Sequence, residues 1–445
     1  MRRTERVRSR FSYATLATLL VIACSGEPAA PVQVPRARTT LPPPFPGVLA
    51  IVGANVVTMV GGSVLADQTV VVRDGRIEAV GPRAGVEVPP DAERLEAQGA
   101  YLLPGLIDAH VHLLRSDVDS YLRAGITTVR NMWGTPGVAA LRAEAAAGAP
   151  LPTIFSAGPG IDGSPAVWPY TELPASPSEA ADVVTRHVAD GWDFIKVYDR
   201  LSPASYDAVV NRARELGVAV IGHVPRGVPI GRALDRGQAS IEHLTGYALA
   251  VGGWAASDRR RFAPLARATA ERGVWVCPTL LVVAALSSQQ APAESAAVVQ
   301  NRRALVRALY DAGAPLLAGT DAGIGIVRPG TALAGELEEL VAAGLPPIAA
   351  LRAATVSPAR LLGVGAELGT IEVGKRADLV LLGGDPLTNI GRVRAPLGIV
   401  LRGRWLPGGG PGPSERQLSA LGSAPLGVVL RGLWLPSGGS GPSAR

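Results

Sequence analysis

The sequence contains little cysteine and few aromatic residues. Only two cysteines, Cys24 and Cys277, occur among its 445 residues. Because Cys24 falls in an expected export segment, a single thiol remains and a disulfide framework is excluded. Cys277 lies in an apolar run and is expected to be a small buried residue. Aromatic residues make up 4% of the chain and hydrophobic residues 47%, so the core must be built mainly from Val, Leu, Ile and Ala.

Lysine is equally scarce. Of the 43 Lys and Arg residues, only Lys196 and Lys375 are lysines. An amine can lose its proton and react, whereas a guanidinium stays charged, so each lysine invites a chemical explanation. The formal net charge is +6. The basic residues are scattered along the chain, however, and this argues against nucleic-acid binding.

Residues 1–24 have the features of an export signal. Several arginines precede an apolar run from Ala14 to Ala23 that is too short for a stable membrane span. The following Cys24 completes a segment that resembles a bacterial lipobox, which implies a lipid anchor on this cysteine and a location in the periplasm or cell envelope. A plain cleaved signal and an uncleaved anchor are the alternatives. Residues 25–46 are rich in proline and are expected to form an extended linker.

Short strands are expected on both sides of the central part of the chain. Segments 69–73 and 76–80 flank Asp74-Gly75, a pair typical of a type I′ hairpin turn. A similar pattern recurs at 369–382. We therefore expect 47–100 and 366–423 to form one small β-sandwich domain. Residues 424–445 hold a near-repeat of 395–416 and a tail, and this second copy is either an edge strand or a loose duplicate.

The central residues 101–365 alternate apolar runs with amphipathic segments. Eight of the runs have the length of buried strands, and they lie at 102–108, 126–132, 153–157, 194–198, 218–223, 240–243, 274–281 and 316–320. Eight strands separated by helices over about 250 residues are typical of a (β/α)8 TIM barrel, which is an α/β fold.

Side chains that can bind a metal ion end five of these runs. His110 and His112 are separated by one residue, so on a strand both would project to the same side. The fourth, fifth, sixth and eighth runs end in Lys196, His223, His243 and Asp321. Active sites of such barrels lie at the carboxyl ends of the strands. Imidazole and carboxylate groups are ligands of divalent ions, so we expect a metal site at this rim.

With these residues the chain resembles the amidohydrolase superfamily, and most closely its imidazolonepropionase-like and prolidase-like binuclear members. The resemblance implies a pair of divalent metal ions, for which the ligand types favour zinc. It implies that one ion is held by His110, His112 and Asp321, and the other by His223 and His243.

The resemblance also gives a role to Lys196, the only lysine in the central part of the chain. Lys196 would capture carbon dioxide as a carbamate, which is an anionic group able to bridge both ions. Asp321 would act as a catalytic residue that takes a proton from the attacking water and passes it to the leaving amine. A structural lysine paired with an acid is the alternative for Lys196, and a helix N-cap is the alternative for Asp321.

Substrate contacts can be inferred only from position. Tyr198 lies two residues past Lys196 on the same strand face, so its hydroxyl could reach the substrate carbonyl as a second catalytic group, with packing inside the barrel as the alternative. Trp168 and Tyr170 lie in a long loop after the third run, where a substrate lid would lie. Packing of that loop on itself is the alternative.

Four further polar residues are less clearly placed. Arg130 and Asn131 end the second run, where related enzymes often carry Arg-Asp, so Asn131 indicates altered polar contacts. Arg226 could meet a substrate carboxylate or lie at the surface. His187 falls in the amphipathic helical segment 183–189, and we expect it on the solvated face.

Together these inferences predict a metal-dependent hydrolase of carbon–nitrogen bonds in small amides, cyclic amides or dipeptides. The alternative is a mononuclear deaminase or cyclic-amide hydrolase of the same superfamily, with one ion and an idle Lys196. Such enzymes usually have a glutamate soon after the fifth-run histidine, and here Val224, Pro225 and Arg226 follow instead. A non-catalytic binding protein is a remote alternative, because all six ligand positions are filled. A homo-oligomer is a further expectation.

Overall fold

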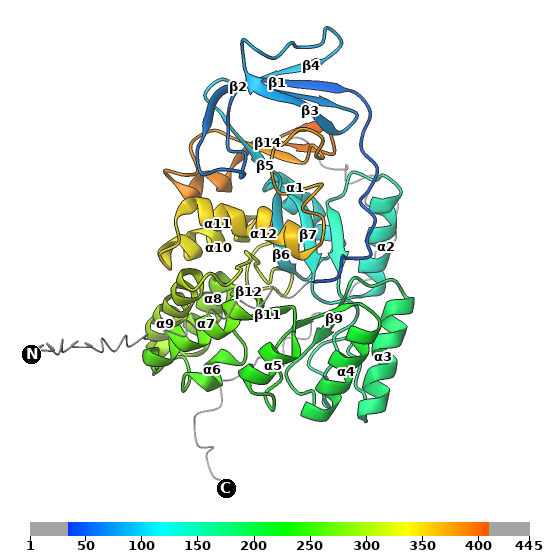
Figure 1. The fold of residues 1–445 in the computed structure, drawn as a ribbon, viewed down its shortest axis with the longest axis vertical. Helices are drawn as coiled ribbons and strands as arrows, with labels where there is room; N and C mark the ends of the chain where they lie inside the picture. Colours follow the sequence, from blue (N-terminus) through cyan, green and yellow to red (C-terminus); the bar gives the residue numbers. More distant parts are fainter. Residues whose placement is uncertain (1–33, 409–445) are drawn as a thin grey trace, which may run out of the picture.

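Both ends of the described chain meet in one large sheet. The computed structural model describes residues 34–408. The strand order in this sheet is β15-β14-β13-β5-β1-β2-β3, with β4 paired to β1, and Figure 1 shows its blue and orange strands at the top of the molecule. The strands are β1 (Val48–Val56), β2 (Leu65–Arg73), β3 (Arg76–Pro82), β4 (Glu93–Glu96), β5 (Tyr101–Pro104), β13 (Leu379–Leu382), β14 (Pro396–Leu401) and β15 (Arg404–Pro407).

The expected hairpin is present within this sheet. β2 and β3 pair in antiparallel register, with Arg73 opposite Arg76. The two turn residues, Asp74 and Gly75, have φ of 48° and 74°. Positive φ at both positions is what a type I′ turn requires, so the local turn chemistry predicted this element correctly.

The central strands run parallel in two sheets, ordered β6-β7-β8 and β12-β11-β10-β9. Their bounds are β6 (Leu106–Val111), β7 (Ile126–Asn131), β8 (Thr153–Ser156), β9 (Phe194–Val197), β10 (Ala219–Gly222), β11 (Ser240–Glu242) and β12 (Trp275–Cys277). Nearly every residue in them is buried, as expected for parallel strands covered on both faces. The predicted α/β class with parallel strands is therefore confirmed.

The first and last expected runs depart from the prediction. The run 102–108 divides at Gly105, where an added Cβ would collide with the side chain of Thr127, so its first half joins the large sheet and its second half becomes β6. The run 316–320 forms only isolated parallel bridges, which pair its start with β12 and Ala322, just past its end, with β6. Asp321 between those bridges has φ of 58°, and this left-handed conformation interrupts regular pairing.

Helices alternate with the central strands and surround them, as Figure 1 shows. Their bounds are η1 (Arg115–Asp117), α1 (Val118–Arg123), α2 (Pro136–Ala146), α3 (Pro177–Ala189), α4 (Pro203–Glu215), α5 (Ile230–Arg236), α6 (Tyr247–Ala250), η2 (Arg259–Arg261), α7 (Phe262–Glu271), α8 (Leu280–Gln290), α9 (Pro292–Asp311), α10 (Thr331–Ala342), α11 (Pro347–Ala353), α12 (Val356–Leu361) and η3 (Ile390–Arg394). Among residues 34–408, none of these helices has the length and apolar character needed to cross a membrane. The segment expected to be an export signal, Cys24 and the 424–445 near-repeat lie outside the described residues.

Three of these helices begin with the same local device. A hydroxyl side chain at the N-cap accepts a backbone hydrogen bond, and proline occupies the first helical position; the N-cap residues are Thr135, Ser176 and Ser202. The hydroxyl satisfies an amide that has no partner within the helix, and proline has no amide to satisfy. These sequence signals fix where α2, α3 and α4 begin.

His187 on α3 is buried, so its predicted place on a solvated face is wrong. The residue is 2% exposed. Ala180, Val183 and Val184 on the same helix are also buried, and residues three and four positions apart share a helix face. His187 therefore continues the apolar stripe of α3 towards the strands, a spacing that the sequence already contained.

The buried carboxylate of Asp193 ties the segment before β1 to the parallel strands. It accepts hydrogen bonds from the Thr39 amide at 2.6 Å and hydroxyl at 2.8 Å, and from the Ser156 amide at 2.8 Å. Arg142 lies 3.2 Å from the same carboxylate. One acidic side chain thus satisfies two backbone amides and one arginine away from water.

We expect Asp193→Ala to lower the free energy of unfolding by about 3 kcal/mol, because it leaves Arg142 and two amides without their partner. Chemical denaturation monitored by circular dichroism measures the loss. Asp182→Ala, at an exposed position on α3, is the control and should change stability little. Equal stability of the two variants would contradict this role for Asp193.

Candidate metal centre

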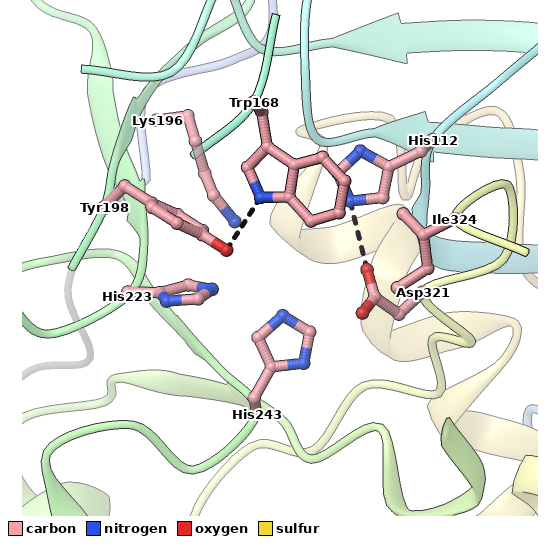
Figure 2. A pocket seen from close by; sticks show the side chains of 8 residues that line it. All are labelled: His112, Trp168, Lys196, Tyr198, His223, His243, Asp321 and Ile324. Carbon is pink, nitrogen blue, oxygen red and sulfur yellow. Dashed lines mark hydrogen bonds and ion pairs between the residues drawn. The ribbon is translucent and has the colours of Figure 1, made fainter. Parts of the chain in front are cut away.

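A small pocket of about 30 Å³ opens at the carboxyl ends of the parallel strands. Figure 2 shows the side chains around it, which come from segments far apart in the sequence. The lining residues are His112, Trp168, Lys196, Tyr198, His223, His243, Asp321 and Ile324. Five of the six predicted metal ligands are among them, and the sixth, His110, is fully buried beside them.

Three of the predicted ligands form a tight group. Nε2 of His110 and Nε2 of His112 lie 3.1 Å and 3.0 Å from the same oxygen of Asp321. The candidate ligating atoms of the three residues all lie within 4.8 Å of one another. His110 Nε2 is buried and makes no hydrogen bond within residues 34–408. A buried nitrogen without a partner, beside a second imidazole and a carboxylate, is a donor set that fits a divalent ion.

The other two histidines adjoin this group. The ring centroid of His243 lies 4.6 Å from that of His110 and 4.9 Å from that of His223. Figure 2 shows His223 and His243 facing the pocket from the side opposite His112. The structure therefore brings all four predicted histidines to one place.

Each of three imidazoles is held from behind through Nδ1. His110 Nδ1 lies 2.9 Å from Glu242 Oε2, and His223 Nδ1 lies 2.7 Å from Asp199 Oδ1. His243 Nδ1 lies 2.7 Å from Thr279 Oγ1. A hydrogen bond at Nδ1 fixes the ring and leaves Nε2 free for a ligand, which is how metal-binding histidines are usually oriented.

The electrostatics of the pocket suit neutral imidazoles beside a charged carboxylate. Burial lowers the pKa of His112 and His223, and that of His243 well below its ordinary value. Burial alone would raise the pKa of Asp321, but attraction to His243 and His110 outweighs it and holds that pKa well below its usual range. Neutral imidazole and ionised carboxylate are the forms that bind metal ions.

Lys196 is enclosed at the floor of the same pocket. It lies in β9 and is 1% exposed. Burial lowers its pKa to about 8. A larger share of the amine is therefore uncharged at neutral pH than in an exposed lysine, and only the uncharged amine is a nucleophile.

Two of the pocket residues have an unusual backbone conformation. His243 and Asp321 both have φ of 58°, a left-handed region that costs energy for residues other than glycine. Arg302 from α9 donates a hydrogen bond to the carbonyl oxygen of His243. The surrounding structure therefore holds these side chains in place against a local preference for other conformations.

Trp168 covers the pocket. Its indole Nε1 donates a hydrogen bond to the Tyr198 hydroxyl oxygen at 2.9 Å, and its ring stacks beside His112 with centroids 6.5 Å apart. Because the indole donates, the Tyr198 hydroxyl retains its own hydrogen for another acceptor. Both residues thus lie where the sequence suggested substrate contacts, whereas Tyr170 from the same loop does not line this pocket and is 48% exposed.

Three other suggested contact residues lie outside the pocket lining. Arg130 is fully buried and donates to Glu242 at 3.0 Å. Asn131 is buried beneath the loops and accepts a hydrogen bond from the Leu113 amide at 2.8 Å. Arg226 pairs with Asp199 at 3.4 Å. Arg130 and Asn131 end β7 as predicted but are buried away from the pocket, and Arg226 takes the surface position that was its alternative.

Sequence reasoning missed the groups that hold the histidines. Asp199 follows Tyr198, Glu242 precedes His243, and Thr279 lies within the seventh run, just past the end of β12. Burial alone would raise the pKa of Glu242, but the charge of Arg130 and the hydrogen bond to His110 outweigh it and lower that pKa. The sequence did contain a signal for two of them, because Asp199 and Glu242 are acidic residues close to candidate ligands at the ends of buried strands.

A model of the amidohydrolase family matches residues 101–406. A solved structure of a Bifidobacterium longum protein, provisionally named a prolidase, superposes with a TM-score of 0.70 at 30% identity, covering 85% of this chain and 99% of that one.

Two relatives match this chain in sequence over most of its length. An imidazolonepropionase of Symbiobacterium thermophilum is 26% identical over 75% of this chain and 90% of its own length. An adenine deaminase of Paracoccus denitrificans is 25% identical over 76% of this chain and 54% of its own length. The chain therefore spans about half the length of that deaminase.

We expect Asp199→Asn to weaken binding of zinc by about tenfold or more, because the ring of His223 loses its charged partner. Equilibrium dialysis of the metal-free protein against zinc measures the affinity. Asp207→Asn, which removes a carboxylate paired with Arg232 on the outer helices, is the matched control. Unchanged zinc affinity in Asp199→Asn would contradict the role given to this residue.

Proposed function

The chain belongs to the amidohydrolase family, and from this premise we propose that it is a metal-dependent hydrolase of carbon–nitrogen bonds. One observation carries the proposal. A buried lysine, four histidines and an aspartate from five separate segments converge around a single pocket. No structural need of the fold explains so many ionisable groups at one buried place.

The proposed ligand set is binuclear. His110, His112 and Asp321 would hold one divalent ion, and His223 and His243 the other. Mixed imidazole and carboxylate ligands favour zinc. When bound, two such ions would supply a Lewis acid for the substrate carbonyl and an activated water as nucleophile.

Lys196 would join the two halves of this set as a carbamate. Its uncharged amine nitrogen attacks the carbon of carbon dioxide. An N–C bond forms while one C–O π bond breaks, and one proton leaves the nitrogen, so a neutral amine becomes an anion with two oxygens. Burial of the amine supports this, because it favours the uncharged form. Arginine could not take this role, and the protein has only one other lysine, Lys375.

Two residues of the chain would act on the substrate. Asp321 accepts the proton of the attacking water and returns it to the leaving nitrogen as the C–N bond breaks. Tyr198 donates its free hydroxyl hydrogen to the substrate carbonyl oxygen, and Trp168 keeps that hydroxyl oriented. The indole also limits the water that reaches the pocket.

The parallel strands would form a closed (β/α)8 barrel around this pocket. Bridges between residues 157 and 194 join β8 to β9, and the bridged segment 316–322 lies between β12 and β6. These contacts support a ring of eight strands for residues 101–365. We further propose that 47–100 and 366–423 make up a β-sandwich domain beside it, and that residues 1–24 direct export with a lipid anchor at Cys24. A linker over 25–46 would follow, with its described end held against the parallel strands through Thr39.

The substrates proposed are small amides, cyclic amides, N-acyl amino acids or dipeptides. The likeness to the imidazolonepropionase and to the Bifidobacterium longum protein supports this class. The second candidate is a mononuclear deaminase, which the match to adenine deaminase favours. Lys196 argues for the binuclear form, because in the mononuclear one its burial beside the ligands would have no purpose.

We expect Lys196→Ala to abolish hydrolysis of a panel of N-acyl amino acids and dipeptides by the zinc-loaded protein, because the bridging group is lost. Lys375→Ala is the matched control, since Lys375 bonds to Gly365 and Thr370 near the large sheet and should leave turnover unchanged. Retained turnover in Lys196→Ala would refute the binuclear proposal.

Metal stoichiometry separates the two candidate functions. The metal-free protein, given zinc and bicarbonate, should bind two ions for each chain, and removal of carbon dioxide should weaken that binding because Lys196 then remains an amine. Elemental analysis after dialysis provides the count. A single ion bound regardless of bicarbonate would favour the mononuclear deaminase.

A further inference from the structure

A second hollow lies behind the loop that carries Trp168. It has a volume of about 260 Å³ and opens between this loop and the end of α3. Its main side chains are Tyr170, Glu172, Arg186, His187, Asp190 and Trp192. None of them lines the pocket of the candidate metal centre, so the two cavities are separate, although Trp168 and Tyr170 belong to one loop.

His187 is the unusual member of this lining. Both of its ring nitrogens are buried, and neither has a hydrogen-bond partner within residues 34–408. Its Nε2 lies 3.8 Å from Glu172 Oε1, which is longer than a hydrogen bond. Buried polar atoms are rarely left unpaired. A donor group placed to one side of this pair, within hydrogen-bond distance of both atoms, could bond to both.

The charges around the hollow favour a cation. Glu172 and Asp190 are acidic, and Arg186, the basic residue opposite them, already pairs with Glu172 at 3.1 Å. Asp190 makes no ion pair in the described part of the chain. It also follows the last turn of α3, where the free carbonyl groups of a helix attract positive charge.

The remaining walls are aromatic. Tyr170 presents a half-exposed ring, and its backbone has φ of 57°. Trp192 is buried on the other side. The guanidinium of Arg142 lies 5.2 Å from the centre of the Trp192 ring, but it is paired with Asp193 and does not line the hollow. Aromatic faces of this kind hold flat apolar groups and attract organic cations.

We propose that this hollow is a binding site for a primary arylalkylamine. Its ammonium donates hydrogen bonds to Glu172 Oε1, to His187 Nε2 and to the Asp190 carboxylate, and its ring packs against Tyr170 and Trp192. An ammonium suits this place because it has three donors and no acceptor. It supplies His187 with the partner that the protein lacks there.

The site is independent of the proposed hydrolysis, because none of its residues is assigned to the metal centre. It is nevertheless linked to that centre in the chain. Glu172 lies four residues after Trp168, and its backbone is fixed by hydrogen bonds with Gly160 at 2.9 Å and Asp162 at 3.0 Å. A bound amine would therefore rest against the same loop that covers the metal centre from its other side.

Calorimetric titration of the full-length protein with phenethylamine tests the proposal. We expect saturable binding of one molecule for each chain. The isosteric alcohol 2-phenylethanol and the anion 3-phenylpropionate should bind at least about tenfold more weakly, since they lack the ammonium. Equal binding of the alcohol, or no saturable binding of the amine, would overturn the proposal.

Three variants test whether the amine binds in this hollow. Asp190→Asn should weaken phenethylamine binding roughly fivefold or more, whereas Asp182→Asn, also exposed on α3, should leave it unchanged. His112→Asn in the metal centre should also leave the affinity unchanged. Loss of binding in His112→Asn, or equal affinity in both aspartate variants, would show that the amine binds elsewhere and would refute the assignment.

Discussion

The arrangement of the pocket depends on hydrogen bonds that lie behind it. His110, His223 and His243 each use Nδ1 for a partner in the protein, and this turns Nε2 towards the shared space. The partner of His110 is Glu242, itself held by Arg130. Without such partners a buried imidazole could rotate or change tautomer, and convergence of the ligands would not follow from the fold.

Much of the architecture could be predicted because it follows from local rules. The Asp74-Gly75 turn, the hydroxyl-proline helix starts and the apolar runs of the parallel strands all depend on residues close in sequence. The candidate ligands could be located for a related reason. Parallel strands place their carboxyl ends on one rim, so residues at those ends lie close together in the folded protein although they are far apart in sequence.

What could not be predicted depends on contacts between distant segments. The sequence located Arg130 at the end of the second run but not its contacts, because its partner Glu242 is more than a hundred residues away. His187 was expected in water, although its spacing from Val183 and Val184 placed it inside. The break at Gly105 depends on the nearby Thr127 of the next strand, which no local pattern reveals.

The indole of Trp168 has a consequence for the kinetics of ligand entry. With the ring stacked beside His112 and bonded to Tyr198, the space beneath it is small, at about 30 Å³. A bulkier molecule must first break one hydrogen bond, worth about 1 kcal/mol, and displace the stacked ring. Association with this protein would then be a two-step process, in which displacement of the indole precedes binding and lowers the apparent association rate about fivefold or more.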